Sequence, residues 1–404
     1  MTLSGHKRGS SPRRLLIVSH VVHYQYEGKL YAYSPYAKEI ELWADLFHEL
    51  LIASPLHQDT PPADCIPFEH KNIRVLPQPE FGGPAFKDKL IQVMALPLMV
   101  HSLAKAMRQA DAIHVRCPGN LGLLGVLLAP FYTRYRIAKY AGQWNDYPGE
   151  ALTTRLQKAL LKSKWWNAPV TVYGQWPHQP KNVVPFFTSI MSDQQMTSAQ
   201  KMASEKTLHD PLRVVYIGRL TKAKNVHTLL QAIGLFLGSG RRCECRIIGT
   251  GPEYDSLKKL TEELRIAGSV QFVGGLPFEE VLAQYQWADV LVLASETEGW
   301  PKAITEAMAF GVVCIGSNRG LIPQILTDER GFLVKPGDTQ ELADALIQIS
   351  DSKEGYITKS RNASHWSKPY TNSRLQESLK ELMSRSWNLN WESNQSTDKA
   401  AEKG

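Results

Sequence analysis

The 404-residue sequence lacks several features that would place it in a class at once. Its five cysteines form no CxxC pair and no spaced framework, which excludes a disulfide scaffold and indicates reduced structural thiols. Cys243 and Cys245 have no further cysteine or histidine nearby, so they make a poor metal site. The longest apolar run, LGLLGVLLAPF at 121–131, is well short of the roughly 20 residues that a membrane-spanning helix needs. A nucleic-acid-binding motif is also missing.

The basic start of the chain is followed by LLIVSHVV, which is too short and too polar-ended for the apolar core of a signal peptide. We therefore expect the protein to stay in the cytosol. Hydrophobic residues at 43% and charged residues at 21% are typical of a globular protein. Because 404 residues exceed what one core usually holds, two domains are expected.

Positive charge is concentrated in the first half of the chain. Residues 1–200 hold 21 lysines and arginines against 14 aspartates and glutamates, whereas residues 201–404 hold 25 of each class. This asymmetry favours an anionic partner for the first half, such as a membrane surface, an acidic glycan or nucleic acid. A basic domain without such a partner stays an alternative. The segment RLQKALLKSKWW at 155–166 is equally consistent with a helix on an anionic leaflet and with a helix packed on a sheet.

Short β-rich runs alternate with amphipathic stretches along the whole chain. The predicted strands are 14–21, 50–54, 73–78, 112–116, 136–142, 169–174 and 182–186, then 212–218, 245–251, 270–275, 289–295, 312–317 and 331–336. This alternation predicts α/β architecture with parallel sheets covered by helices on both faces. We expect two doubly wound domains facing each other across a cleft, with ligands at the carboxyl ends of the strands.

Composition also predicts the domain boundaries. Residues 1–188 form the first domain and residues 211–370 the second, while the polar segment 189–210 between them reads as a linker. Residues 371–388 are expected to form a helix that packs back on the first domain. The final residues, 389–404, have little to bury and are expected to be disordered.

Two glutamates eight positions apart mark the second domain, in SETEGWPKAITEAMAFG at 295–311. Glu298 follows a predicted strand, and Glu306 lies about two turns into the predicted helix that begins near Pro301. A shared proton requires carboxylates within a few ångströms, which this geometry disfavours. The pair therefore predicts two acceptors for different parts of one ligand, with an ordinary helix glutamate as the alternative for Glu306.

A second loop, after the predicted strand 212–218, is basic. It holds Arg219, Lys222 and Lys224 ahead of an apolar helix. An arginine fork and a lysine point charge at the end of a strand can hold a diphosphate between them. The competing dinucleotide motif is incomplete, because Pro252 follows the glycines of GTG at 249–251 and no acidic residue stands about 20 positions on. This excludes a NAD-dependent oxidoreductase.

Together these segments resemble the retaining GT-B glycosyltransferases of family 4, also called group 1, which use nucleotide-diphosphate sugars. The matching segments are GRLTKAKN, IIGTGPEYDSL, VQFVGGLPFEEVLAQYQWADVLVLAS and the E-x7-E element EGWPKAITEAMAFGVVCIGS. They follow the order of the family and cover nearly all of residues 212–350.

The resemblance implies roles for residues of the second domain. The donor sugar is assigned to Glu298, Gly299, Trp300 and Pro301, the ribose to Glu306, and the diphosphate to Arg219 and Lys224, with Lys222 as a substitute and with Gly218 and Gly251 in the donor-binding loops. Arg219, Lys224 and Glu298 are thus candidate catalytic residues. The family needs no metal or cofactor here, since the two cations neutralise the diphosphate.

The first half resembles the family less closely. Gly28 is the one glycine where relatives often have two, and Tyr24 belongs to an aromatic-rich loop suited to sugar stacking. His114 and Arg116 lie in the strand that carries an active-site histidine in many relatives, but Arg116 occupies the slot of that histidine. Arginine cannot act as a base near neutral pH, although it can stabilise a phosphate or sugar oxygen. We expect Arg116, Gly28 and Tyr24 on the acceptor side, with Arg116 also a candidate catalytic residue. His114 is expected either in a catalytic role or packed beneath the site.

The resulting hypothesis is a cytoplasmic glycosyltransferase that moves a sugar from a nucleotide-diphosphate donor to a glycan or lipid-linked acceptor in envelope or exopolysaccharide synthesis. It is expected on the inner face of the plasma membrane as a peripheral protein, with no nucleic-acid partner. Two alternatives stay open. One is a sugar-nucleotide epimerase or phosphorylase of the same fold, and the other is a donor-binding scaffold without catalysis.

Overall fold

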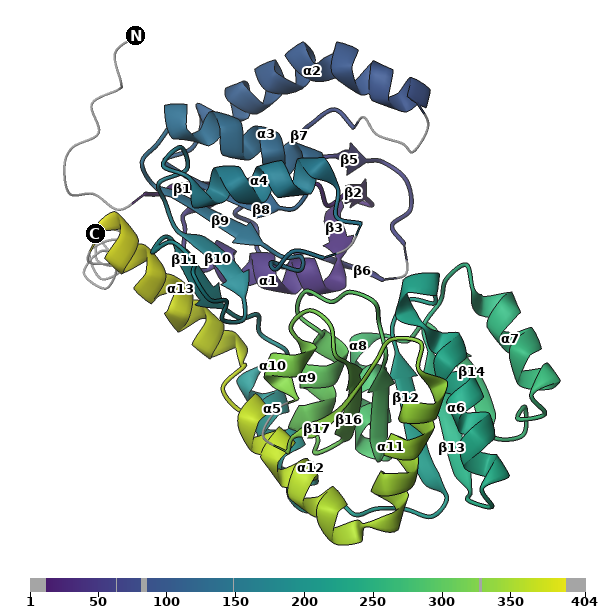
Figure 1. Ribbon diagram of the computed structural model, residues 1–404. Helices are drawn as coiled ribbons and strands as arrows, with labels where there is room; N and C mark the ends of the chain where they lie inside the picture. The colour runs from purple at the N-terminus through teal and green to yellow at the C-terminus, as the bar shows by residue number, and fades with distance from the viewer. Residues whose placement is uncertain (1–11, 63, 81–85, 148, 327–328, 390–404) are drawn as a thin grey trace. The chain divides into compact units, whose positions relative to one another are not determined.

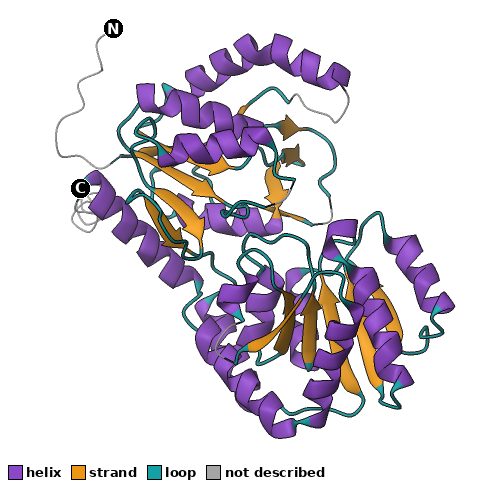
Figure 2. Cartoon of the chain, viewed as in Figure 1, coloured by secondary structure: helices purple, strands orange, loops and turns teal. Residues whose placement is uncertain are grey.

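The computed structural model describes residues 12–62, 64–80, 86–147, 149–326 and 329–389, with the backbone alone for residues 86–93. These residues divide into two compact units. Unit 1 comprises the described residues up to Phe186 together with those from Leu375 on, and unit 2 comprises Phe187–Arg374. In each unit the strands form a sheet flanked by helices (Figure 2).

Unit 1 is built on a parallel sheet of seven strands, in the order β11-β10-β9-β8-β1-β4-β7. The strands are β1 (Arg14–Val18), β4 (Glu49–Ser54), β7 (Ile73–Pro77), β8 (Ala112–Cys117), β9 (Arg136–Tyr140), β10 (Val170–Tyr173) and β11 (Val183–Phe186). Each of them coincides with a sequence-predicted strand, so the seven predictions for this sheet are confirmed. Apolar runs that are buried on both faces specify such a parallel sheet.

Helices cover both faces of this sheet (Figure 1). On one face, α2 (Phe86–Met107), α3 (Asn120–Leu128) and α4 (Leu152–Lys162) contribute Met107, Val126 and Leu161 to one hydrophobic core with the strands. The short 3₁₀ helix η1 (Ala129–Phe131) follows α3. On the other face lie α1 (Ser34–Ala44) and α13 (Asn372–Trp387).

The region after β1 differs from the sequence prediction. Tyr24 and Gly28, expected in an aromatic-rich loop, belong instead to the hairpin of β2 (His23–Tyr26) and β3 (Lys29–Tyr33). This hairpin pairs with β5 (Leu56–His57) and β6 (Cys65–Pro67) in a second, four-stranded sheet. Both strands are rich in tyrosine, which favours a half-buried strand, and in β2 the tyrosines alternate with polar residues. The hairpin turns at Glu27 and Gly28, with φ of 48° and 76°. Gly28 therefore has a local reason to be glycine, because a two-residue turn of this kind needs positive φ.

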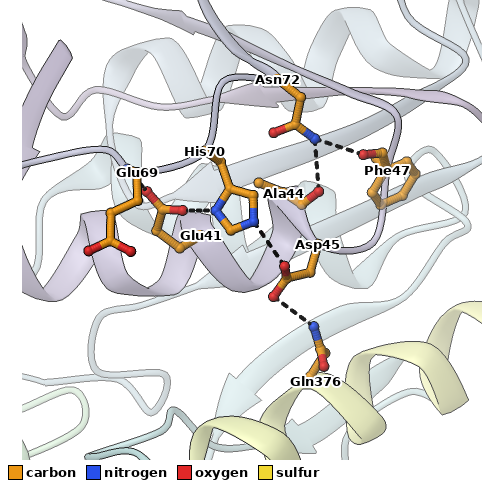
Figure 3. Close-up of polar contacts among 8 residues, drawn as sticks. All are labelled: Glu41, Ala44, Asp45, Phe47, Glu69, His70, Asn72 and Gln376. Atoms are coloured by element: carbon orange, nitrogen blue, oxygen red, sulfur yellow. Dashed lines mark hydrogen bonds and ion pairs between the residues drawn. The ribbon is translucent and has the colours of Figure 1, made fainter. Parts of the chain in front are cut away.

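A histidine clamp connects three parts of unit 1 (Figure 3). His70 lies between two carboxylates of α1: its Nδ1 bonds Glu41, and its Nε2 lies 2.9 Å from Asp45 Oδ1. The other oxygen of Asp45 accepts a bond of 3.0 Å from Gln376 on α13. Partial burial alone would lower the pKa of His70, but Glu41 and Asp45 outweigh it and raise that pKa above its usual value.

This clamp predicts a pH-dependent contribution to stability. A histidine whose pKa is raised on folding stabilises the protein fully below its unfolded pKa and loses that effect as pH rises through the folded pKa. We expect His70→Gln to lower the melting temperature more at pH 5.5 than at pH 9, as measured by differential scanning fluorimetry. His101→Gln, at an exposed position of α2, is the matched control. An equal loss at both pH values for His70→Gln would contradict the clamp.

Unit 2 is built on a parallel sheet of six strands, in the order β14-β13-β12-β15-β16-β17. The strands are β12 (Leu212–Ile217), β13 (Cys243–Ile248), β14 (Val270–Gly274), β15 (Val290–Leu293), β16 (Val313–Ser317) and β17 (Gly331–Val334). All six coincide with predicted strands, so these predictions are confirmed as well.

The helices of unit 2 lie on both faces of its sheet (Figure 1). They are α5 (Asp193–Ser204), η2 (Lys222–Lys224), α6 (Val226–Gly238), α7 (Tyr254–Glu263), α8 (Phe278–Trp287), α9 (Lys302–Ala309), α10 (Ile322–Ile325), α11 (Thr339–Asp351) and α12 (Lys353–Ser367). Helices α6, α7 and α11 pack together, and α5, α8, α9 and α12 form a second group around α9.

The prediction of a linker at 189–210 is wrong for most of that segment, because it contains helix α5. Ser192 and Gln195 form a capping box that starts the helix. The helix packs on α9 and α12 through Ala199 and Ala203, which are buried. Met196 is the third buried side chain of α5, and Gln200 donates to Ala309 O and Ser364 O. One methionine and two alanines carry too little hydrophobicity to reveal a helix in a polar stretch.

The helix expected at 371–388 is α13, whose residues from Leu375 on belong to unit 1. Its Trp387 packs on Tyr135 with ring centroids 5.5 Å apart. The segment expected to be disordered, 389–404, lies outside the described residues from residue 390 on. No helix within the described part of the chain is both long and apolar enough to cross a membrane.

Candidate functional site

The strand order of unit 2 defines a switch point at the carboxyl ends of β12 and β15. The chain runs outward from β12 through β13 to β14, and then returns to the other side of β12 for β15, β16 and β17. In open parallel sheets of this kind, ligands bind in the crevice where the strand order reverses. The loops after β12 and β15 therefore form the candidate site, and they hold the predicted residues Arg219, Lys224 and Glu298.

The loop after β12 presents three cations in a short span. Arg219 and Lys222 are exposed, while Lys224 is half-buried at the end of the 3₁₀ turn η2. Asn225 then adopts a left-handed conformation with φ of 51°, which ends the turn and starts α6. Asparagine tolerates this left-handed conformation better than most residues, so Asn225 suits the backbone geometry at this position.

An ion pair joins the two loops. Lys224 Nζ lies 2.5 Å from Glu298 Oε1, and the Glu298 side chain is only 11% exposed. Asn225 Nδ2 also donates to Ala294 O at 3.0 Å and to Glu296 Oε1 at 2.9 Å. These bonds hold a basic and an acidic side chain beside each other at the switch point. A diphosphate can bind the cations there, while the carboxylate can accept hydrogen bonds from the hydroxyls of a sugar.

Glycines allow the loop after β13 to pack against the loop after β12. A Cβ on Gly249 would lie 1.9 Å from the carbonyl oxygen of Gly218, and a Cβ on Gly251 would lie 2.3 Å from that of Leu220. Backbone bonds continue the strand pairing into these loops, with Gly218 N donating to Ile248 O at 3.0 Å. Gly249 and Gly251 are therefore needed for close backbone approach, whereas a Cβ on Gly218 would meet the Tyr216 hydroxyl at 2.9 Å.

Glu306 lies on α9, within the interior of unit 2. It is 7% exposed, and its Oε2 accepts a bond of 2.9 Å from the hydroxyl of Tyr285. Burial, and then the Glu306 carboxylate, raise the pKa of Tyr285 well above its usual value. Tyr285 thus stays protonated and donates to Glu306. The two predicted acceptors come from different elements, Glu298 from the loop after β15 and Glu306 from α9, as the sequence indicated.

Trp300 is held by its own unit. Its Nε1 donates to Thr305 Oγ1 at 3.1 Å, and its ring packs on Tyr370 and Trp366 with centroids 5.1 and 6.5 Å away. Gly299 precedes Trp300 in the loop. Pro301, predicted within the first helical turn, is the residue before α9 begins at Lys302. These contacts fix the loop shape around the indole.

Unit 1 has its own switch point between β1 and β8, and Arg116 lies near it in a buried cluster. Arg116 Nη1 and Lys139 Nζ each lie 2.7 Å from an oxygen of Glu39 on α1. Burial raises the pKa of Glu39, but the two cations outweigh it and lower that pKa well below its usual range. The guanidinium of Arg116 also lies over the ring of Tyr36, 4.9 Å from its centroid. Arg116 is thus held in place by unit 1 itself.

His114 lies beneath this cluster. It is 1% exposed and packs on Trp43 with ring centroids 4.6 Å apart. Neither ring nitrogen has a hydrogen-bond partner in the structure as described. Burial, and then Arg116, lower the pKa of His114 well below its usual value, so the ring is neutral. This burial contradicts a role in direct contact with a substrate and favours the packing alternative.

The other residues expected on the acceptor side, Tyr24 and Gly28, lie in the hairpin of the small sheet, and one further histidine lies near the switch point of unit 1. Tyr24 on β2 faces Tyr31 across the hairpin, which Gly28 closes. The sequence analysis missed His20, which follows β1 directly: a Cβ on Gly119, after β8, would lie 3.0 Å from its Nδ1. Its position after the first strand of a doubly wound unit was the signal that could have found it.

The comparison with protein families gives a match that lies within unit 2. Residues 198–366 match the family model described as glycosyl transferases group 1. The amylovoran biosynthesis glycosyltransferase AmsK of Erwinia amylovora is 33% identical over 157 residues, which cover 37% of this chain and 39% of that protein. The chain thus matches about two-fifths of the length of this curated relative.

Solved structures match nearly the whole chain. Sucrose-phosphate synthase from Thermosynechococcus elongatus has a TM-score of 0.69 at 19% identity, over 92% of this chain and 98% of that one. Anabaena Alr3699/HepE, solved in complex with UDP-glucose, has a TM-score of 0.64 at 16% identity, over 92% and 99%. At these identities the likeness shows the fold. Residues 198–366 belong to the glycosyl transferases group 1 family, and the chain that contains them has the GT-B fold.

Proposed function

We propose that the chain is a glycosyltransferase of the family 4 type that transfers a sugar from a nucleotide-diphosphate donor. The observation that carries this proposal is the Lys224–Glu298 pair at the switch point of unit 2, with Arg219 in the same loop as Lys224. The family match over residues 198–366 supports it. The Anabaena neighbour, solved with UDP-glucose, is consistent with a donor of this class.

Charge stabilisation is the main chemical task of these residues. When the bond between sugar and diphosphate breaks, negative charge develops on the leaving phosphate oxygens. Arg219 offers a planar fork of donors and Lys224 a compact ammonium, so together they stabilise that charge without a metal or cofactor. Glu298 keeps Lys224 in position and accepts hydrogen bonds from the sugar hydroxyls. The backbone of Gly299, Trp300 and Pro301 contacts the same sugar.

The acceptor hydroxyl attacks the face from which the diphosphate leaves and gives its proton to the departing phosphate oxygen, so the anomeric configuration is retained. This route requires no nucleophilic side chain. In unit 1, Arg116 is a positioning residue within the Glu39 cluster, and Tyr24 and Gly28 belong to the acceptor side. We propose a glycan or lipid-linked acceptor on the cytoplasmic side of the membrane, in polysaccharide synthesis of the kind named for AmsK.

A panel of UDP- and GDP-sugars tests the activity. The protein is incubated with each donor, with and without a polyprenyl-phosphate-linked sugar as acceptor, and release of nucleoside diphosphate is measured. Release that rises with acceptor supports transfer, and the anomeric proton coupling in the product reports retention. Conversion of a donor to its epimer without acceptor would identify an epimerase. Binding without turnover or donor hydrolysis would identify a scaffold.

Glu306→Gln tests the ribose assignment. The amide keeps an oxygen for the Tyr285 hydroxyl but loses the charge that ribose hydroxyls would meet, so we expect nucleoside-diphosphate affinity to fall by about tenfold or more. Calorimetric titration of UDP and GDP measures the change. Glu262→Gln, at an exposed position of α7 in the same unit, is the matched control. Unchanged affinity in Glu306→Gln, with an unchanged melting temperature, would remove Glu306 from the donor site.

A further inference from the structure

The stretch of unit 1 from within α2 to the end of β11 and a few residues beyond is poor in acidic residues. Residues 89–192 contain twelve lysines and arginines but only three acidic residues, Asp111, Asp146 and Glu150. All three have partners within unit 1: Asp111 accepts from the backbone of Arg14 at 2.9 Å, and the other two pair with Lys158 at 2.7 Å each. Helix α3 carries no charged residue. In and just after α2 and α4 the described, exposed charged side chains are cations, namely Lys105, Arg108, Arg155, Lys162 and Lys164.

The same layer exposes most of the large apolar side chains that the structure places in solvent. Ten described residues of this kind are exposed, and seven of them belong to α2, η1, α4 or the residues just after α4. They are Met94, Leu96, Leu98, Phe131, Leu152, Leu156 and Trp165. We call these seven side chains, with the basic residues around them, the α2–α4 face.

Helix α4 shows how the face is built. Leu152 and Leu156 lie one turn apart and are 79% and 52% exposed, while Leu161 on the inner side is fully buried. Arg155 and Lys162 on the same helix are exposed. Arg155 Nε lies 3.6 Å from Glu150 Oε2, and Lys162 Nζ lies 5.1 Å from the centroid of the Trp144 ring. The outer side of this helix is thus apolar with a basic edge, whereas a helix that merely packs on a sheet keeps a polar outer side.

An aromatic pair extends this surface beyond the helix. Phe131 is 66% exposed and packs edge-to-face on Trp165, with ring centroids 5.4 Å apart. Trp165 Nε1 donates to Val126 O on α3 at 3.1 Å, which holds the indole at the surface. Lys164 beside it is exposed. Tryptophan next to lysine, with apolar rings directed outward, suits the boundary between lipid headgroups and acyl chains.

We propose that the α2–α4 face binds the surface of an anionic phospholipid bilayer. Leu152, Leu156, Phe131 and Trp165 enter the region below the headgroups, and Lys162, Lys164 and Arg155 contact the lipid phosphates. A second copy of the chain fits this face less well. A two-fold interface brings the same surface of both copies together, so exposed cations such as Lys162 and Lys164 would face the same cations of the second copy.

Vesicle sedimentation tests this proposal on the full chain, without any nucleotide sugar, so the result is independent of the proposed activity. Vesicles of phosphatidylcholine alone are compared with equimolar phosphatidylcholine and phosphatidylglycerol. We expect binding to the anionic vesicles to be at least about tenfold stronger and to fall with added salt, because lipid charge is screened over about 10 Å at 0.1 M.

Two double variants separate the apolar and the electrostatic contributions. Leu152→Gln with Leu156→Gln removes apolar contact and is expected to weaken vesicle binding by about tenfold. Lys162→Gln with Lys164→Gln removes two charges, each of which contributes about fivefold to the affinity for an anionic leaflet. The double variant is also expected to lose most of the salt dependence of vesicle binding. All four positions are exposed, so the melting temperatures should stay close to that of the parent chain.

Matched controls come from unit 2. Leu235→Gln changes an exposed leucine of α6, and Lys258→Gln with Lys259→Gln changes two exposed lysines of α7. Both should bind vesicles as the parent chain does. Equal binding of the parent chain to both vesicle types, or patch variants that bind like the parent, would overturn the proposal. So would a dimer that dissociates in Leu152→Gln with Leu156→Gln while vesicle binding is absent, because the face would then join two copies.

Discussion

Lys224→Ala is expected to lower kcat/KM for sugar transfer by about 10²- to 10³-fold, the effect of removing one preorganised donor from a developing anion. The loss has two causes. The leaving diphosphate loses a cation, and Glu298, which is 11% exposed and bonded to Lys224 at 2.5 Å, loses its partner. Nucleoside-diphosphate affinity should fall together with the rate. Steady-state kinetics and calorimetric titration measure the two effects.

Lys222→Ala is the matched control, because Lys222 belongs to the same 3₁₀ turn and is exposed. We expect it to change kcat/KM by less than about threefold, as solvent screens an exposed charge. A large loss in Lys222→Ala together with parent-like kinetics in Lys224→Ala would assign the diphosphate to Lys222. The role proposed for Lys224 would then be wrong.

Gly249→Ala is expected to destabilise unit 2 by about 3 kcal/mol or more, which places it among the severe single substitutions. The added Cβ would stand 1.9 Å from the carbonyl oxygen of Gly218, a backbone atom that a side-chain rotation cannot move away. The φ of 139° adds strain for any residue other than glycine. Because Gly218 precedes Arg219, the shift should also disturb the cation loop. Thermal unfolding would show a melting temperature lower by roughly 6–12 °C.

Gly234→Ala, in the same unit, is expected to raise the melting temperature slightly instead of lowering it. Gly234 is an interior residue of α6, and a Cβ there would meet nothing within 4 Å. Alanine favours a helix over glycine by about 1 kcal/mol, so this variant should be slightly more stable than the parent chain. If Gly249→Ala unfolded at the same temperature as Gly234→Ala, the two loops could not pack as closely as described.

The main sheets could be predicted because their signal is local. Runs such as LRVVYIG and DVLVLAS combine β-branched residues with flanking turns. Continuous apolar runs of this length are typical of parallel strands that are buried on both faces. The small sheet was missed because β2 (HYQY) and β3 (KLYAY) are only four and five residues long and neither forms an apolar run. Helix α5 was missed because its contact depends on the packing of small residues such as Ala199 and Ala203, which composition does not reveal.

The candidate site in unit 2 could be predicted in part. Lys224 and Glu298 are 74 positions apart, and their proximity follows from adjacent strands in the switch-point order rather than from sequence spacing. In unit 1 the cluster of Glu39, Arg116 and Lys139 was not predicted. It requires the register of β8 with β9, which pairs Arg116 with Lys139, and the placement of α1 over that face. Neither is readable from a single sequence.

The most direct test of the donor assignment is a crystal structure of the protein with a bound nucleoside diphosphate chosen by thermal-shift screening of nucleotides. The assignment predicts that Arg219 and Lys224 lie about 3 Å from the diphosphate oxygens and that the Glu306 carboxylate accepts from the ribose hydroxyls. A diphosphate bound elsewhere in the chain, with Arg219, Lys224 and Glu306 all out of contact with the ligand, would contradict the assignment.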